Sequence, residues 1–347
     1  MRTIPIKESI LSRPAMYVGS TDTKGVYRML EAFLLDMISS AEMNEAEIEI
    51  APKGLIRITS SDLNVKTVMK KLEILEYGFD PTDMDVLTKI LDLSVILTLS
   101  GSVKIEVYNG KTYTLTGEKG EFKTDTEDNY IPHDFLIEFV PDQNIFQQPE
   151  LKFEDLNTIY QRIASINPDI EIISVDNAGR EHQRCVFHYP NGLADKMDSL
   201  VIQRSIDEPH IRLNIEQARG DFHYSVSFSF LNYAVSPYIQ SFAGYVDTLY
   251  HGSLVDGIVK GIVKAIENYA TKNGIDIEVS DKRIKEEGFI LVASVLGPNY
   301  RFGGSMKLEL EMPEVEEGVE EIVFNELSAY FDQDKEKADS FISRFKK

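Results

Sequence analysis

Apolar residues recur every three or four positions in several long stretches of the chain. Leu30, Phe33, Leu34 and Met37 follow this spacing and predict a helix over residues 25–38. The same period predicts further helices over residues 65–75, 82–96, 153–166, 193–201 and about 253–271, with two more near the C-terminus. The helix period therefore runs through most of the chain.

Other stretches alternate strictly between apolar and polar residues, which is typical of half-buried strands. The segments EIEI and LIRIT predict a strand pair, and Asn109-Gly110 joins two alternating runs into a hairpin over residues 104–117. Further strands are expected over residues 134–142, 170–175, 184–188, 211–217, 224–233 and 288–297. Helices and strands intermix throughout, so we expect a mixed α+β fold.

The chain has 347 residues, which is the length of about two ordinary domains. The segment Asp207-Glu208-Pro209 interrupts both kinds of periodicity and is typical of a domain boundary. We therefore expect one domain over residues 1–205 and a second over residues 206–347.

Charge and cysteine content exclude several classes of protein. The chain carries 57 acidic and 36 basic side chains, for a net charge of −21, so direct binding to DNA phosphates is not expected. Its single cysteine, Cys185, excludes an intramolecular disulfide and a cysteine-rich zinc module. The start of the chain has no apolar run long enough for a signal peptide, and the most apolar stretch, residues 288–297, is too short for a membrane helix. We expect a cytoplasmic protein without a membrane partner.

Two local clusters allow a functional and a structural interpretation. His182, Cys185 and His188 could suggest a metal clip, but alternation along a strand would turn Cys185 away from the two histidines, so no metal site is expected. Residues 309–326 hold eight glutamates and no lysine or arginine. This run is either a solvated helix face or an acidic surface that meets a basic partner or imitates DNA phosphates.

Three blocks of sequence, in order, are similar to a known family. They are RPAMYVGS at residues 13–20, FVPDQNIF at residues 139–146, and a C-terminal block comprising residues 257–269, IKEEG, FILVASVL and PNYRF. Together they resemble the N-terminal half of the ATPase subunit of bacterial type IIA topoisomerases, the gyrase B subunit and its topoisomerase IV counterpart. The resemblance covers most of the chain.

The resemblance implies a GHKL (Bergerat) α/β sandwich of the nucleotide-binding type, followed by a transducer-like α+β domain with a ribosomal-protein-like fold. In the family a TOPRIM region follows and holds magnesium for DNA cleavage. This chain ends after the expected transducer helices, so we expect it to lack that machinery.

The resemblance also assigns nucleotide-site positions. The family motif E-x-x-D-N becomes residues 32–36, so the general base position is Ala32 and the magnesium position is Asp36. The adenine-reading D-x-G-x-G becomes residues 60–64, with Ser60 in place of its first aspartate. Only Lys307 is kept from the family's Q-T-K loop. Asp36, Ser60 and Lys307 are therefore expected as vestigial nucleotide-site positions, and no residue is expected to be catalytic.

Two further family elements are replaced. The glycine-rich phosphate lid corresponds to residues 86–94, which contain no glycine and favour a continuous helix. The G-T pair before the strand at residue 139 becomes Asp134-Phe135. These changes indicate a pseudo-ATPase without a cofactor, and ATP with magnesium would bind only if the divergent pocket still functions.

Three functions remain open. The preferred one is a gyrase B-like binding or regulatory module, linked to DNA topology or topoisomerases, whose partner is a protein with a basic surface or a second copy. The first alternative is an ATP-hydrolysing domain, activated in an assembly, in which Asp36 holds magnesium and Lys307 holds phosphate. The second is an acidic protein that imitates DNA through its glutamate run.

Overall fold

A computed structural model of the chain describes residues 1–147, 149–179, 182–204, 211–233, 236–304 and 308–346. The chain folds as two units, Met1–Tyr189 and Pro190–Lys347. The expected boundary at residues 207–209 lies outside the described residues, and the observed division comes earlier. Helix α8 (Leu193–Arg204) belongs to the second unit because it packs against the strands of that unit.

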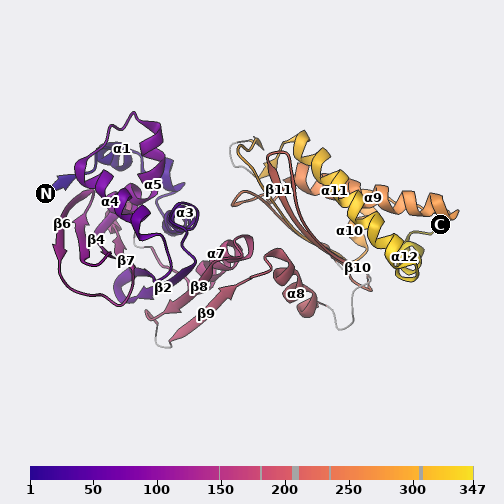
Figure 1. Ribbon diagram of the computed structural model, residues 1–347, viewed down its shortest axis with the longest axis horizontal. Coiled ribbons are helices and arrows are strands. Elements are labelled where there is room, and N and C mark those ends of the chain that lie inside the picture. Colours follow the sequence, from indigo (N-terminus) through magenta and orange to yellow (C-terminus); the bar gives the residue numbers. More distant parts are fainter. Residues whose placement is uncertain (148, 180–181, 205–210, 234–235, 305–307, 347) are drawn as a thin grey trace. The chain divides into compact units, whose positions relative to one another are not determined.

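The first unit is built on a nine-stranded sheet with the order β1-β6-β5-β4-β7-β3-β2-β8-β9 (Figure 1). Neighbouring strands are antiparallel, except that β2 and β8 run parallel. The strands are β1 (Arg2–Thr3), β2 (Glu45–Ala51), β3 (Leu55–Ser60), β4 (Ser100–Tyr108), β5 (Thr112–Glu118), β6 (Glu121–Glu127), β7 (Phe135–Pro141), β8 (Glu171–Asp176) and β9 (Gln183–His188).

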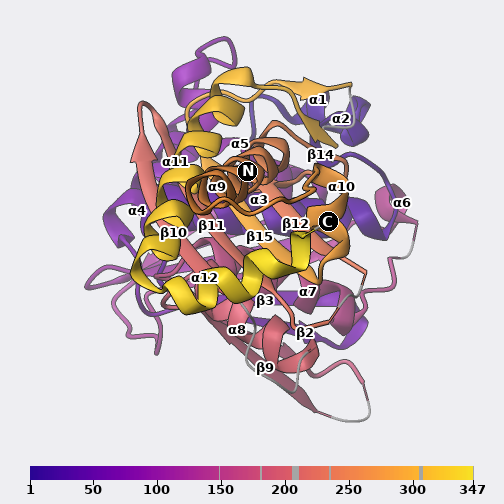
Figure 2. The ribbon, with the colours of Figure 1, turned by 90° about the vertical axis from the view of Figure 1, so that its right-hand side faces the viewer.

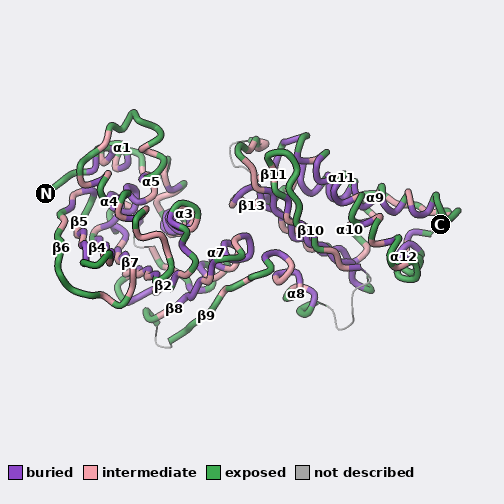
Figure 3. The backbone as a smooth tube through the Cα atoms, viewed as in Figure 1, coloured by how far each residue is buried: buried purple, intermediate pink, exposed green. Residues whose placement is uncertain are grey.

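Helices bury one face of this sheet. They are α1 (Lys7–Ser12), α2 (Pro14–Val18), α3 (Thr23–Ala41), α4 (Val65–Tyr77), α5 (Met84–Leu99), α6 (Gln143–Phe146) and α7 (Phe153–Ile166), with a short 3₁₀ turn η1 (Pro52–Gly54). Alternation along β3 turns Ile56 and Ile58 into the core, whereas Arg57 faces outward between Glu49 and Glu138. Figure 3 shows buried and exposed stretches along the helices and strands of this unit. The alternation therefore sorts apolar and charged residues onto opposite faces.

The second unit has a five-stranded sheet, β10-β11-β15-β12-β13, and a three-stranded sheet, β14-β17-β16. Its strands are β10 (Ile211–Arg219), β11 (Phe222–Phe230), β12 (Tyr238–Ala243), β13 (Val246–Asp247), β14 (His251–Gly252), β15 (Phe289–Leu296), β16 (Phe302–Gly303) and β17 (Glu309–Leu310). Its remaining helices are α9 (Ser253–Asn273), α10 (Asp281–Glu286), α11 (Pro313–Gln333) and α12 (Lys335–Ile342), followed by η2 (Ser343–Phe345).

Helices α9 and α11 lie side by side over the larger sheet of the second unit (Figures 1 and 2). Glycines permit the close approach: a Cβ on Gly257 would lie 2.4 Å from the carbonyl oxygen of Glu316, and one on Gly261 2.6 Å from that of Glu320. Lys260 and Lys264 form ion pairs with the same two glutamates. The same alignment of α9 with α11 therefore produces both the close backbone contact and the two ion pairs.

The long helices and the alternating strands agree with the sequence-based expectations. Two strands of moderate length, β6 and β12, were not expected. Four of the seven residues of β6 are exposed, so its sequence lacks a full apolar alternation. Within the described residues, no helix is long and apolar enough to cross a membrane.

We predict that Gly261→Ala lowers the free energy of unfolding by about 1–3 kcal/mol, because the added methyl group overpacks the contact with α11. In a helix without such a contact, replacing glycine by alanine would stabilise the helix by about 1 kcal/mol. A loss of stability in Gly261→Ala would therefore be due to the close contact with α11. Chemical denaturation measures the change. Lys260→Ala serves as the control, since an exposed ion pair contributes at most about 1 kcal/mol. A Gly261→Ala variant as stable as the native chain would contradict the prediction.

Candidate functional site

Helix α3 carries the two positions that the resemblance assigns to the general base and the metal. Asp22 caps the helix by accepting a hydrogen bond from the Lys24 amide, and Phe33 and Leu34 are fully buried. Ala32 and Asp36 are four residues apart, so they lie on the same side of the helix, one turn from each other. Ala32 offers no proton acceptor, and the chemistry available there comes from Asp36 and its neighbours.

The Asp36 carboxylate is held by Lys71 of α4. The Lys71 ammonium donates hydrogen bonds of 2.8 Å to each carboxylate oxygen and one of 2.6 Å to the backbone carbonyl of Lys89 on α5. The side chain of Lys71 is 3% exposed and that of Asp36 is 13% exposed. One carboxylate oxygen also accepts a hydrogen bond of 3.1 Å from Ser40. At the position that the resemblance assigns to magnesium, Asp36 therefore forms a nearly buried ion pair with Lys71.

A second carboxylate, Asp92 of α5, lies close to this pair. Burial raises the pKa of Asp92, the Asp36 carboxylate raises it further, and the Lys71 ammonium opposes both. Helices α3, α4 and α5 thus bring two carboxyl groups, Asp36 and Asp92, near one ammonium group, that of Lys71. Both Asp36 oxygens already accept hydrogen bonds from Lys71, so a divalent cation at Asp36 would have to compete with the ammonium. Across the described part of the chain, no three His, Cys, Asp or Glu residues gather as metal ligands would.

The expected adenine position lies at the end of β3, next to β7. Ser60 is buried and is the register partner of Phe135. Its hydroxyl makes only long contacts, 3.4 Å, with the backbone of Asp62. The Phe135 ring stacks on Phe33 of α3, with ring centroids 6.3 Å apart. An aromatic contact therefore fills the place of the family's threonine hydroxyl.

Helix α5 crosses the segment that corresponds to the glycine-rich lid. The helix runs from Met84 to Leu99, and its cap Asp83 accepts hydrogen bonds from the amides of Asp85 and Val86. Leu87 and Leu91 pack against the core of the first unit. The predicted continuous helix is thus present. Helical hydrogen bonding engages the backbone amides that a flexible loop would turn toward phosphates.

The nearest other carboxylate on α3 is Glu31, which precedes the base position. Glu31 is 6% exposed and forms ion pairs with Arg162 of α7 and with Arg28, the latter at 3.3 Å. Both ion pairs hold the Glu31 carboxylate between α3 and α7.

Two residues in this site were missed by the sequence analysis, Lys71 and Arg162. Lys71 lies within the apolar stripe of α4, between Val68 and Leu75. A lysine at a buried helical position requires a partner, and this was the available signal. Arg162 is similarly enclosed, on the amphipathic helix α7. Lys307, the third expected position, lies outside the described residues.

His182, Cys185 and His188 do not converge. His182 contacts the Asn177 side chain, the Cys185 thiol accepts a 3.6 Å hydrogen bond from Asn157 of α7, and His188 lies 3.7 Å from Glu171. Each of the three residues thus has its own partner.

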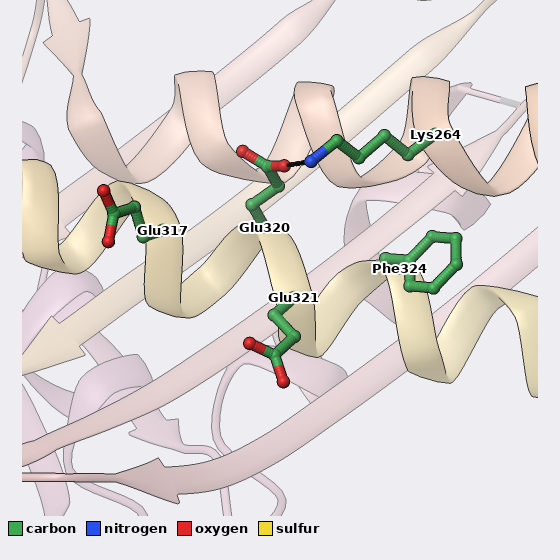
Figure 4. Close-up of a pocket in the computed structure, with 5 residues that line it drawn as sticks. All are labelled: Lys264, Glu317, Glu320, Glu321 and Phe324. Carbon is green, nitrogen blue, oxygen red and sulfur yellow. Dashed lines mark hydrogen bonds and ion pairs between the residues drawn. The ribbon is translucent and has the colours of Figure 1, made fainter.

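The glutamate run is partly neutralised by cations from elsewhere in the second unit. Glu314 pairs with Arg301, and Glu321 pairs with Arg219, at 2.7 and 2.6 Å. Glu316 and Glu320 pair with Lys260 and Lys264. Figure 4 shows the Lys264–Glu320 contact beside Glu317, Glu321 and Phe324, which line a cavity of about 400 Å³. Four of the eight glutamates therefore have an internal partner.

The first unit is a helix-covered mixed sheet, and the second α+β unit has long paired helices. This is the arrangement expected from the resemblance to a GHKL ATPase-like sandwich followed by a transducer-like domain. The comparisons with known proteins agree with this class.

The relatives are gyrase B proteins. Residues 192–347 match the family model described as DNA gyrase B. The chain is 24% identical to the DNA gyrase B subunit of Archaeoglobus fulgidus and 24% identical to the chloroplastic/mitochondrial DNA gyrase B subunit of Oryza sativa, in each case over 97% of the chain. It spans 56% and 50% of these proteins, so it corresponds to about half of their length.

Solved structures have the same fold. The B subunit of Myxococcus xanthus DNA gyrase superposes with a TM-score of 0.78 at 20% identity, covering 98% of this chain and 99% of that one. The 43K ATPase domain of Thermus thermophilus gyrase B, in complex with an aminocoumarin, gives a TM-score of 0.79 at 19% identity, covering 98% and 94%. The chain thus resembles DNA gyrase B subunits in sequence and has the fold of the gyrase B ATPase region.

We predict that Asp92→Asn stabilises the protein at neutral pH. A carboxyl group whose pKa is raised by folding favours the folded state when protonated and opposes it when ionised. The gain should therefore be largest above the pKa of the folded state and should fade as the pH falls below the ordinary aspartate range. Melting temperatures measured across this pH range test it. Glu73→Gln, at an exposed carboxylate on α4, is the control. A gain that does not change with pH would contradict the prediction.

Proposed function

We propose that this protein is a gyrase B-like binding or regulatory module that does not hydrolyse ATP. The observation that carries the proposal is helix α5, which is regular and capped across the segment that the resemblance assigns to the phosphate lid. Phosphates are held on this type of fold by free backbone amides, which glycine-rich loops expose. A packed helix exposes none along its length.

The remaining substitutions support the same function. Hydrolysis requires a group that takes a proton from water, and Ala32 cannot do so while Glu31 is held by Arg162. The family's magnesium position, Asp36, is bound to Lys71. Loss of both a general base and an electrostatic group removes several kcal/mol of barrier reduction. The module would act through binding instead.

Its proposed partner is a protein, in keeping with relatives that are named as subunits. A partner linked to DNA topology, with a basic surface, would meet the glutamates of the run that have no ion pair among the described residues. These are Glu309, Glu311, Glu317 and Glu326. Such a contact would weaken at high ionic strength. A homodimer is the other arrangement that the relatives suggest.

We predict no ATP turnover above background and no change in melting temperature at millimolar ATP and magnesium. The packed helix α5 and the occupied Asp36 carboxylate leave the nucleotide without its usual contacts. A coupled phosphate-release assay and thermal-shift titration measure these two quantities, with a gyrase B ATPase domain as the positive control. Turnover that disappears in Lys307→Ala would establish the ATP-hydrolysing alternative and exclude this function.

We also predict that Ala32→Glu does not restore hydrolysis. The substitution returns a carboxylate to the base position, but it leaves the α5 helix and the Lys71 contact in place. The same phosphate-release assay tests this, with circular dichroism to confirm folding. Turnover in Ala32→Glu alone would show that the missing base was the only defect.

A further inference from the structure

We propose that the Lys71 ammonium is the resident cation of the first unit, and that it occupies the place where the resemblance puts magnesium. The biological meaning of this inference rests on the proposed function. The inference itself is that the first unit folds without a metal ion, which is a separate property from the absence of ATP hydrolysis. Its support is the geometry around Asp36.

The ammonium uses its full hydrogen-bonding capacity at this site. A lysine head group has three N–H donors, and three acceptors surround Lys71: the two Asp36 oxygens at 2.8 Å and the Lys89 carbonyl at 2.6 Å. With 3% of its side chain exposed, Lys71 has almost no contact with water. The ammonium is therefore a fixed part of the interior.

The same oxygen atoms are those that a hard divalent cation would use. Magnesium and calcium bind carboxylate and carbonyl oxygens, and the Asp36 carboxylate and the Lys89 carbonyl supply such oxygens around the Lys71 ammonium, with the Asp92 carboxylate near enough to interact with the pair electrostatically. A divalent cation at the Asp36 carboxylate would lie next to the Lys71 ammonium, and two positive charges that close together repel each other. Lys71 and a metal ion would therefore compete for Asp36.

Lys71 differs from a dissolved ion in being covalently attached to α4. A dissolved metal ion would join α3 and α5 only when it is present in solution. Lys71 links α3, α4 and α5 in every folded molecule, and it does so between segments far apart in the sequence. The helix layer is consequently locked in one arrangement, whatever the supply of metal ions.

The test compares four proteins: the native chain, Lys71→Ala, the double variant Asp36→Asn/Lys71→Ala, and Lys70→Ala. Lys70 is the exposed neighbour on the same helix and serves as the matched control. Melting temperatures are measured with a chelator and with increasing Mn²⁺, without nucleotide. The native chain and Lys70→Ala should show no shift. Lys71→Ala should melt lower than both, and Mn²⁺ should raise its melting temperature.

The double variant separates a cation site from general destabilisation. Without the Asp36 carboxylate, Mn²⁺ should give no increase, whereas in Lys71→Ala a metal concentration about tenfold above the dissociation constant should shift the folding equilibrium about tenfold. If Lys71→Ala is unfolded in chelator, Mn²⁺ should refold it, as followed by circular dichroism. Failure of Mn²⁺ to stabilise or refold Lys71→Ala would overturn the proposal, as would an equal shift in the native chain. ATP turnover by the native chain would contradict the proposed function and leave this comparison valid.

Discussion

The helix layer of the first unit depends on the neutralisation of a buried carboxylate. Asp36 lies on a helix whose buried residues are apolar apart from Glu31, and an uncompensated charge there would cost several kcal/mol. Lys71 supplies the compensating charge from α4 and reaches the backbone of α5 with its third donor. One ionic contact therefore joins three helices that also share the apolar core of the first unit.

Substitutions around this contact are matched by new partners. The loss of the family's threonine hydroxyl accompanies the stacking of Phe135 on Phe33. Glu31, beside the absent base, is held by Arg162, and leucines of α5 pack where glycines would leave room. Unpaired polar groups are costly when buried. The Asp36 and Glu31 carboxylates are paired from within the chain, whereas the Ser94 and Thr98 hydroxyls of α5 are buried without a hydrogen-bond partner among the described residues. The two carboxylates on α3 are thus neutralised without a ligand.

The sequence predicted the parts of this arrangement that depend on local patterns. The period of apolar residues placed α3 and α5, and the absence of glycine between residues 86 and 94 predicted the continuous helix. The contact between Asp36 and Lys71 joins residues 35 positions apart, and periodicity carries no information about such pairs. β6 was missed because its alternation is mostly polar, so its place is set by pairing with β5 and β1.

The ion pairs of the second unit reduce the number of acidic side chains that are available to a partner. A net charge of −21 suggests an extended negative surface, yet half of the densest glutamate run is used inside the second unit. Two of those pairs lie at the glycine contacts between α9 and α11, where close backbones bring lysines of one helix next to glutamates of the other. Glu316 and Glu320 therefore form ion pairs that join α9 and α11. In both units, then, charges that the sequence presents as candidates for a ligand are engaged by the chain itself, and the proposed partner would have to bind the carboxylates that remain.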